Sequence, residues 1–484
     1  MGTGSDVLLT TASQQPQAGK PQNGSNNLLQ RPLWLVREQL RATFLPSGYL
    51  ATVGPGYLPF VWWQAVHHAA SSANGVLAST FMLYSVGLGA GAIPTAGAIN
   101  WVLKDGLGQL GTLLFGKTIA HRFDINTKSW YLMASAKLDV AIGLEICTLL
   151  CPPYFLVMGA GANMLKGLAW MAGGSTRSAF NVSFARDNNI ADITAKATSQ
   201  TICTSLLGTT AGLSLASAIG QSIPAALGAY TVLTSVHLYS AYRCVQSIPL
   251  TSLNPSRLEA LCEHFLDAVP QPGSRAVLPD ALSTRQPFAP QQESSTEAEA
   301  MRSRAPWKAQ QGGSCERATT SQEDPDEPGV ITLPGPIELA ATDPVVPWPE
   351  RWRDPGLRPS IRVGTPIAKL HQLPGDLLAM LVDLHQTERH LLIPGGGHLH
   401  LVLHTDAEPV HSLQAYLHAC LFRRILRKQA SSGHQLPTTK LQAAVTASLI
   451  DSKLCVPQFR QRLVHAGWAT NKIVIEPKRC RGTW

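Results

Sequence analysis

Long apolar runs without charge dominate the first half of the chain. Residues 42–103 give 62 consecutive positions without Asp, Glu, Lys or Arg, residues 197–242 give 46, and residues 146–165 give 20. A helix that crosses a bilayer needs about 20 predominantly apolar residues. Each run is therefore long enough to span, and the first two are long enough to do so as helical hairpins. We predict that this part of the chain is embedded in a membrane.

The composition of these runs leaves a second interpretation open. They are rich in Gly, Ala, Ser and Thr rather than in Leu, Ile and Phe, as in GLGAGA at residues 87–92 and GAGA at residues 159–162. Small residues let helix backbones approach closely, which is how helices associate in lipid. The alternative is a large soluble helical core with tight crossings.

Gly and Pro punctuate the pattern and place the ends of the predicted helices. The first helix is amphipathic, and the next ones are apolar over most of their length. The predicted helices cover residues 33–44, 57–84, 95–115 and 128–150, followed by two apolar helices that meet near residues 220–224 and a short helix that ends near residue 266.

The pattern differs near the C-terminus. Residues 388–393 and 398–404 flank a PGGG turn and predict a β-hairpin. Amphipathic helices are predicted over residues 412–428 and 439–465, and a short strand over residues 472–475. The predicted fold class is mainly α, with an N-terminal multi-helix, Gly/Ala-rich membrane domain and a small C-terminal α+β domain.

Shifts in composition set the predicted domain boundaries. Residues 1–30 are rich in Gln, Ser, Gly and Asn and are predicted to be disordered. Fifteen of the 34 prolines lie in residues 270–359, so a disordered Pro-rich linker is predicted over residues 269–359. The helical domain then covers residues 31–268, and the α+β domain covers residues 360–484.

Charge and cysteine content exclude several classes of function. The net charge is +8, but no concentrated basic face or recognition motif accompanies it, so no nucleic-acid partner is expected. The nine cysteines include no C-x-x-C pair, which favours a reducing compartment over a disulfide scaffold or a zinc ribbon. No secretory signal or transit peptide is evident. We expect a membrane location and leave the organelle open, with the plastid among the candidates.

Several segments in the same order resemble the root UVB sensitive (RUS) family, formerly a domain of unknown function. The resemblance covers residues 45–268 well and residues 360–484 more loosely. The segments that carry it are GYLPF at 56–60, WVLKDGLG at 101–108, AGGSTR at 172–177, ARDNNIADITAK at 185–196, HLY at 237–239 and AGW at 466–468, with the terminal Trp484.

The resemblance implies a membrane protein without an established catalytic activity. In plants the family is tied to seedling responses to UV-B, to vitamin B6 homeostasis and to auxin transport. This chain departs from the family pattern at three positions: Tyr131 replaces an arginine, Ser135 an acidic residue and Thr201 a glutamate. If those charges belong to one network, this protein has lost part of it.

The few charges inside the apolar region are the candidate site residues, because an ionisable group is costly in lipid or in a helical core. Lys104 and Asp105 follow an apolar helix and precede GLG, where they are expected to line a polar cavity or to form a charged pair at a membrane boundary.

Residues 173–177 (GGSTR) are the best candidate for binding an anion. Two glycines allow close backbone approach, a helix is expected to begin near Ser175 and Thr176, and Arg177 can hold a phosphate or carboxylate. The alternative is helix capping with an ion pair from Arg177 to Asp192. Asp192 and Lys196 are spaced for an intrahelical pair. The predicted ligand-binding residues are Lys104, Asp105, Arg177, Asp192 and Lys196.

Metal and catalytic chemistry find less support. His398, His400 and His404 share one face of a strand, a pattern that zinc or copper can use, but a solvated hairpin face explains it better. His67 and His68 are interpreted as packing beside tryptophans, and the basic stretch at residues 423–428 as a solvated helix face with a secondary affinity for lipid headgroups. No catalytic triad or carboxylate pair is found. We expect no metal, no cofactor and no enzymatic activity.

These observations predict a non-enzymatic RUS-family membrane protein that acts as a carrier, sensor or scaffold. Its expected ligand is a small anionic metabolite, for which the resemblance alone suggests a vitamin B6 vitamer. The alternative is a soluble or peripheral helical scaffold that forms homo- or hetero-oligomers with other family members.

Overall fold

A computed structural model gives the fold over ten stretches of the chain. These are residues 30–85, 94–119, 123–269, 331–343, 345, 359–365, 375–395, 397–430, 438–475 and 481–484. Except at residue 30, where a helix begins, the disorder predicted for residues 1–30 therefore concerns positions outside the described residues, as does the disorder predicted for most of residues 269–359. Inside the predicted linker, the described residues 331–343 are ordered and include a helix, α9 (Pro336–Thr342).

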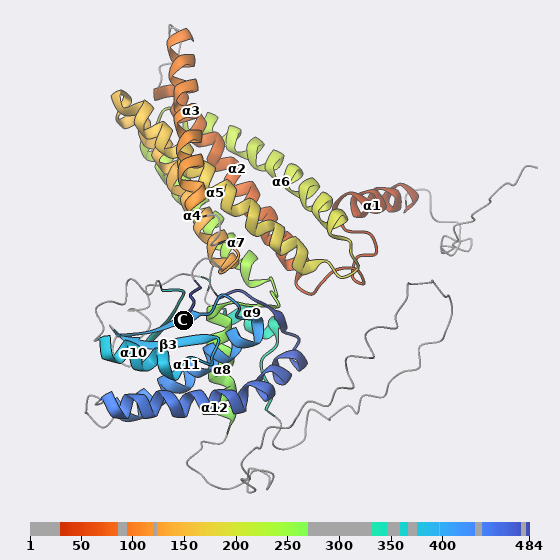
Figure 1. Cartoon of the computed structure of the whole chain (residues 1–484). Coiled ribbons are helices and arrows are strands. Elements are labelled where there is room, and N and C mark those ends of the chain that lie inside the picture. The colour runs from red at the N-terminus through yellow and green to blue at the C-terminus, as the bar shows by residue number, and fades with distance from the viewer. Residues whose placement is uncertain are drawn as a thin grey trace, which may run out of the picture.

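Six long helices form an elongated bundle, which stands above the C-terminal domain in Figure 1. They confirm the predicted mainly α character of this region. The helix between residues 155 and 184 is longer than the sequence pattern indicated, because it continues through Gly173 and Gly174. The six helices are α2 (Tyr57–Ser85), α3 (Pro94–Ile119), α4 (Thr127–Ile146), α5 (Phe155–Phe184), α6 (Ile190–Ile219) and α7 (Ile223–Gln246).

Small residues bring α2 and α6 into backbone contact. Gly208 and Gly212 are one helical turn apart on α6, and they face Ala69 and Ala73 of α2. A Cβ at Gly208 would lie 2.3 Å from the carbonyl oxygen of Ala69, and one at Gly212 would lie 2.7 Å from the Cα of Ala73. The spacing is that of the small-xxx-small motif of packed membrane helices.

Helix α1 (Gln30–Phe44) lies outside the bundle, beside the end at which α6 begins, and runs across the direction of the bundle helices (Figure 1). Its apolar side chains Leu35, Val36 and Leu40 are each more than half exposed. The amide of Gln200 in α6 donates to the carbonyl of Phe44 and fixes the end of α1 to the bundle.

The C-terminal domain combines two small sheets with helices α8 (Pro255–Ala268), α10 (Gly375–Leu384), α11 (Pro409–Ala430) and α12 (Thr438–His465). The predicted hairpin is present as the antiparallel pair β3 (His390–Gly395) and β4 (His398–Leu403). Strand β2 (Ser360–Val363) runs parallel to β4 on its other side. Neither β2 nor α10 was expected from the sequence pattern.

The segment before residue 269 packs into the core of the C-terminal domain. Strand β1 (Ser252–Leu253) pairs with β5 (Ala469–Ile473), and the ring of Phe265 lies 4.9 Å from that of Phe459. Arg423 of α11 is buried and pairs with Glu259 and Glu263 of α8. The interpretation of residues 423–428 as a solvated face is therefore wrong for Arg423. Two carboxylates of α8 compensate the charge of its buried guanidinium.

A buried ion cluster joins the bundle to the C-terminal domain. Asp343, at the end of α9, lies 3.5 Å from Lys128 of α4 and 2.8 Å from Arg257 of α8, and all three side chains are 4% exposed. Asn254 also donates to Asn126 at the start of α4. The bundle end that contains the start of α4 therefore rests on the C-terminal domain (Figure 1).

The turns after α4 and α6, at the opposite end of the bundle, carry no charge, and Glu145 in the last turn of α4 pairs with Lys166 of α5. Ser85, at the end of α2, accepts a hydrogen bond from Thr148 in the turn after α4, so these helix ends meet away from the C-terminal domain. Residues 146–155 and 216–226, which contain the turns there, include no Asp, Glu, Lys or Arg. The bundle is therefore strongly asymmetric, with its charged turns on the side of the C-terminal domain.

Candidate ligand site in the helical bundle

A cluster of polar side chains lies between the apolar helices of the bundle. Helical spacing places its members on inward faces, because residues three or four apart share a face. Every bundle helix except α3 contributes. The cluster, which we call the polar centre, comprises Gln64, His67 and His68 of α2, Tyr131, Ser135 and Asp139 of α4, Arg177 of α5, Thr201 of α6 and His237 of α7.

Two histidines form the middle of the polar centre. The rings of His67 and His237 lie 4.1 Å apart in a tilted stack. His67 Nε2 is 3.0 Å from the hydroxyl of Ser135, and His237 Nδ1 is 2.8 Å from a carboxylate oxygen of Asp139. The carboxylate fixes the orientation of the His237 ring, as in many proton-transfer and binding sites.

Arg177 forms one side of the polar centre. Its Nη2 lies 2.6 Å from His68 Nε2, and its Nη1 donates to the hydroxyl of Thr201 at 3.4 Å. Arginine has no acceptor, so His68 Nε2 must accept and the His68 ring is neutral with its proton on Nδ1. This leaves the guanidinium charge without a carboxylate partner in the hydrogen bonds described for it.

Several buried atoms of the polar centre find no hydrogen-bond partner among the described residues. Buried polar groups are normally satisfied, so a concentration of exceptions in one place points to a missing partner such as a ligand or water. They combine donors with acceptors around one cationic group. The unsatisfied atoms are Gln64 Nε2, His67 Nδ1, the Tyr131 hydroxyl, Asp139 Oδ1, Arg177 Nε and His237 Nε2.

The structure places the predicted site residues in three separate surroundings. Arg177 lies in the polar centre, but the helix start expected near Ser175 and Thr176 is wrong. Both hydroxyls bond back to carbonyls one turn earlier in the continuous helix α5. No helix N-terminus is therefore present there to hold an anion, and the anion-binding capacity of this segment rests on Arg177 alone.

Asp192 and Lys196 form the expected intrahelical pair at 3.9 Å. Asp192 also accepts a hydrogen bond from the backbone of Ser47, and Lys196 donates to the carbonyl of Ala42. These contacts tie the last turn of α1 and the segment after it to the first turns of α6. Asp192 is thus engaged with Lys196 and Ser47 rather than with Arg177.

Lys104 and Asp105 form an ion pair of 2.6 Å on α3, and Lys104 also lies over the ring of Trp101. The stem of Lys104 packs on Gly159 of α5. Gly159 precedes Arg177 by 18 residues on the same helix, about 27 Å at 1.5 Å per residue. This pair is therefore remote from the polar centre, and the predicted residues do not converge on one cavity.

The three residues that depart from the family pattern all lie in the polar centre. Tyr131 lies with its ring 5.5 Å from that of His67, Ser135 bonds His67, and Thr201 bonds Arg177. The suspicion that these positions belong to one network therefore fits the geometry. His67 packs against neighbouring rings, as the packing interpretation expects, but both His67 and His68 also contact polar groups of other helices, which that interpretation did not include. The occurrence of two histidines in a charge-free helix was the available signal.

The histidines of the hairpin are engaged separately. His398 Nδ1 lies 2.7 Å from Ser360, His400 Nδ1 lies 3.0 Å from Thr365, and His404 lies 3.6 Å from Asp406. Each of these rings has a polar neighbour of its own, but the predicted solvated face is wrong for His400, which is buried, and none of the three histidines is exposed.

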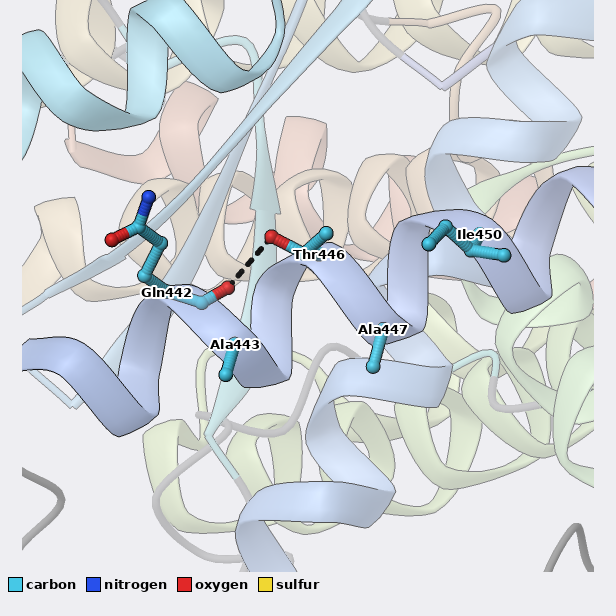
Figure 2. A pocket seen from close by; sticks show the side chains of 5 residues that line it. All are labelled: Gln442, Ala443, Thr446, Ala447 and Ile450. Atoms are coloured by element: carbon cyan, nitrogen blue, oxygen red, sulfur yellow. Dashed lines mark hydrogen bonds between the residues drawn. The ribbon is translucent and has the colours of Figure 1, made fainter.

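A surface hollow on α12 offers little chemistry. It is lined by Gln442, Ala443, Thr446, Ala447 and Ile450, all from one helix. Figure 2 shows these side chains along that helix, with the Thr446 hydroxyl bonded to the carbonyl of Gln442. Such a face lacks the converging polar groups of a ligand site.

Comparisons with known proteins identify both domains. Residues 32–268 match the family described as "Vitamin B6 photo-protection and homoeostasis domain", and residues 351–484 match "Root UVB sensitive protein, C-terminal". Protein root UVB sensitive 3 of Arabidopsis thaliana is 25% identical over 461 residues, which cover 93% of this chain and 87% of the relative.

Other relatives match mainly the helical domain. Protein root UVB sensitive 2, chloroplastic, of Arabidopsis thaliana is 34% identical over 250 residues, and this match covers 51% of the chain and 57% of the relative. RUS family member 1 of Dictyostelium discoideum is 28% identical over 246 residues, 49% of the chain and 47% of the relative. No solved structure matches the chain.

Proposed function

The chain belongs to the root UVB sensitive family, and we propose that it is a membrane protein that binds a small anionic metabolite in the polar centre of its helical bundle. The family domain carries vitamin B6 homeostasis in its description, so a vitamin B6 vitamer is the proposed ligand class. The proposed action is binding and transfer of this metabolite without chemical change.

The outer surface of the bundle supports membrane embedding. Among the described residues, two stretches are long and apolar enough to cross a bilayer by length and composition, Pro152–Phe184 and Ile190–Ile219. Large apolar side chains are more than half exposed along three helices, where lipid tails would cover them. They include Val102, Leu110, Leu113 and Phe115 of α3, Val157 and Trp170 of α5, and Ile202, Leu206, Leu207 and Leu213 of α6.

The distribution of charge supports one orientation. The turns at the far end of the bundle are uncharged, whereas Lys128, Arg186 and Arg243 lie at the end near the C-terminal domain. Lysine and arginine mark the cytoplasmic or stromal side of membrane proteins. Helix α1, with exposed leucines and with Arg37 and Arg41, has the composition of a helix that lies in the membrane interface at that same end.

The observation that carries the ligand proposal is the set of unsatisfied buried atoms around Arg177. A guanidinium with a free Nε and no carboxylate partner in its described hydrogen bonds can hold a phosphate. The neighbouring Gln64 amide and Tyr131 hydroxyl can bond the polar edge of a small ring, and the His67–His237 stack offers it a flat surface.

Replacing Arg177 by alanine tests this assignment. Full-length protein in detergent micelles is titrated with pyridoxine 5′-phosphate, which lacks the aldehyde that would react with lysines, and binding is followed by calorimetry. A charge-assisted hydrogen bond contributes about 1.5–3 kcal/mol, so Arg177→Ala is expected to weaken binding by about 10- to 100-fold.

Arg186→Ala is the matched control, since Arg186 follows the same helix and is exposed. It is expected to bind as the unaltered protein does. Unphosphorylated pyridoxine is expected to bind Arg177→Ala and unaltered protein with similar affinity, because it lacks the anion. Equal affinity of Arg177→Ala and unaltered protein for pyridoxine 5′-phosphate contradicts the assignment.

A further inference from the structure

Three histidines meet in the core of the C-terminal domain, far along the chain from the polar centre. His385 follows α10, His390 begins β3 and His418 lies in α11. His385 and His418 are 0% exposed and His390 is 1% exposed. One ring nitrogen from each lies within 4.8 Å of the other two. Three buried imidazoles in one apolar core are unusual, because each ring nitrogen there needs a hydrogen-bond partner or another ligand.

The hydrogen bonds of the outer nitrogens direct the inner ones toward a common point. His385 Nδ1 lies 2.8 Å from the carbonyl of Leu381, and His418 Nε2 lies 3.2 Å from the carbonyl of Val445 and 3.1 Å from the hydroxyl of Ser448. A carbonyl can only accept, so these ring nitrogens carry the protons. The lone pairs are then on His385 Nε2 and His418 Nδ1, which face His390.

This is the arrangement that metal-binding histidines use. A ligating imidazole donates its second N–H to a backbone carbonyl or carboxylate, which sets its tautomer and orientation. Because the outer nitrogens of His385 and His418 donate to backbone carbonyls, the inner nitrogens of both rings keep their lone pairs for an ion.

One nitrogen of the cluster lacks a partner. His390 Nε2 lies 2.9 Å from His418 Nδ1, which carries no proton, so the His390 N–H donates to it. His385 Nε2, in contrast, is buried and has no hydrogen-bond partner among the described residues. The buried lone pair of His385 Nε2 is therefore available to a metal ion.

We propose that His385, His390 and His418 bind a zinc ion through His385 Nε2, His390 Nε2 and His418 Nδ1. Zinc accepts imidazole nitrogens at about 2.0–2.1 Å, which in a tetrahedral site sets them about 3.3 Å apart. The 2.9 Å pair must open slightly and His385 must approach, movements that side-chain rotation provides. Binding requires the proton of His390 to move from Nε2 to Nδ1, so that both rings stay neutral and each gives one lone pair to the ion.

The surroundings would let an ion held by the three imidazoles stabilise the fold of the domain. The cluster joins the end of α10 to β3 and α11, and the hydrogen bonds of His418 reach α12. An ion bound there would therefore link four elements of the domain. Glu388 is 8% exposed and acts electrostatically on His385, while it also pairs with Lys453 and accepts a hydrogen bond from Gln414. Trp484 donates its indole N–H to the carbonyl of His385 and fixes the end of the chain beside the cluster.

The test is zinc retention by the full chain. Purified protein is incubated with Zn²⁺, freed of excess ions by gel filtration and analysed by elemental mass spectrometry. About one zinc ion per chain is expected in the unaltered protein and in the control His400→Gln, which alters a hairpin histidine outside the cluster. His390→Gln and His385→Gln are each expected to retain almost none.

A second readout keeps the result interpretable if a variant folds poorly. Co²⁺ in a site of three imidazoles gives visible absorption bands, and competition by Zn²⁺ against these bands gives relative affinities. Ser448→Ala removes only an outer hydrogen bond of His418 and is expected to weaken zinc binding by about 10-fold with an unchanged circular dichroism spectrum. Absence of retained zinc in the unaltered chain, or equal retention in His390→Gln, overturns the proposal.

Discussion

An Asp343→Asn variant is expected to lose about 3–5 kcal/mol of stability, the largest single effect that the structure implies. Asp343 is the carboxylate of the buried cluster that joins α4, α8 and α9, and it faces both Lys128 and Arg257. Asparagine keeps the shape but removes the charge. The buried charges of Lys128 and Arg257 then lack a compensating carboxylate. Either water enters the interface to solvate them or the two domains separate.

Asp267→Asn is the matched control for this change. Asp267 also pairs with an arginine, Arg424, but its side chain is 74% exposed. Exposed pairs contribute about 0–1 kcal/mol, so this variant is expected to unfold close to the unaltered protein. Thermal unfolding in detergent, followed by tryptophan fluorescence, compares the two. If both variants unfold at the same temperature, Asp343 does not couple the domains.

Gly208→Ala is expected to destabilise the bundle although alanine favours helices. The added Cβ would lie 2.3 Å from the carbonyl oxygen and 2.7 Å from the Cα of Ala69, and both are backbone atoms that cannot rotate away. Helices α2 and α6 must therefore separate, at a cost of about 1–3 kcal/mol that exceeds the gain of about 1 kcal/mol in helix propensity.

The same substitution in open space gives the comparison. Gly228 of α7 is also helical, and a Cβ there would meet nothing within 4 Å. Gly228→Ala is expected to leave the unfolding temperature unchanged or to raise it slightly. A Gly208→Ala variant that gains stability to the same extent would show that α2 and α6 are not in backbone contact.

The helices of the bundle were predictable because their pattern is local. Charge-free runs and the prolines at positions 94 and 224 mark where α3 and α7 begin. The continuation of α5 through Gly173 and Gly174 could not be predicted from the sequence. Packing between neighbouring helices overrides the low helix propensity of glycine. The short strand β2 was missed because its four residues acquire their pairing only when β4 is beside them.

The candidate sites depend on contacts between distant segments. Arg177 could be selected as a rare charge in an apolar run, but its contact with His68 spans 109 positions of sequence. The cluster of His385, His390 and His418 follows no metal-binding spacing and is assembled by a turn, a strand and a helix. Both arrangements arise from helix crossing and sheet packing, which a single sequence does not specify.

The proposed role of the polar centre as a ligand site assumes that the bundle is embedded in a membrane. Extraction of isolated membranes with alkaline carbonate tests membrane embedding most directly. Full-length protein is expressed in cells, the membranes are treated, and the pellet and supernatant are compared by immunoblotting. The exposed apolar faces of α3, α5 and α6 predict that the protein stays in the pellet until detergent is added. Release into the carbonate supernatant would contradict the account and favour a peripheral helical scaffold.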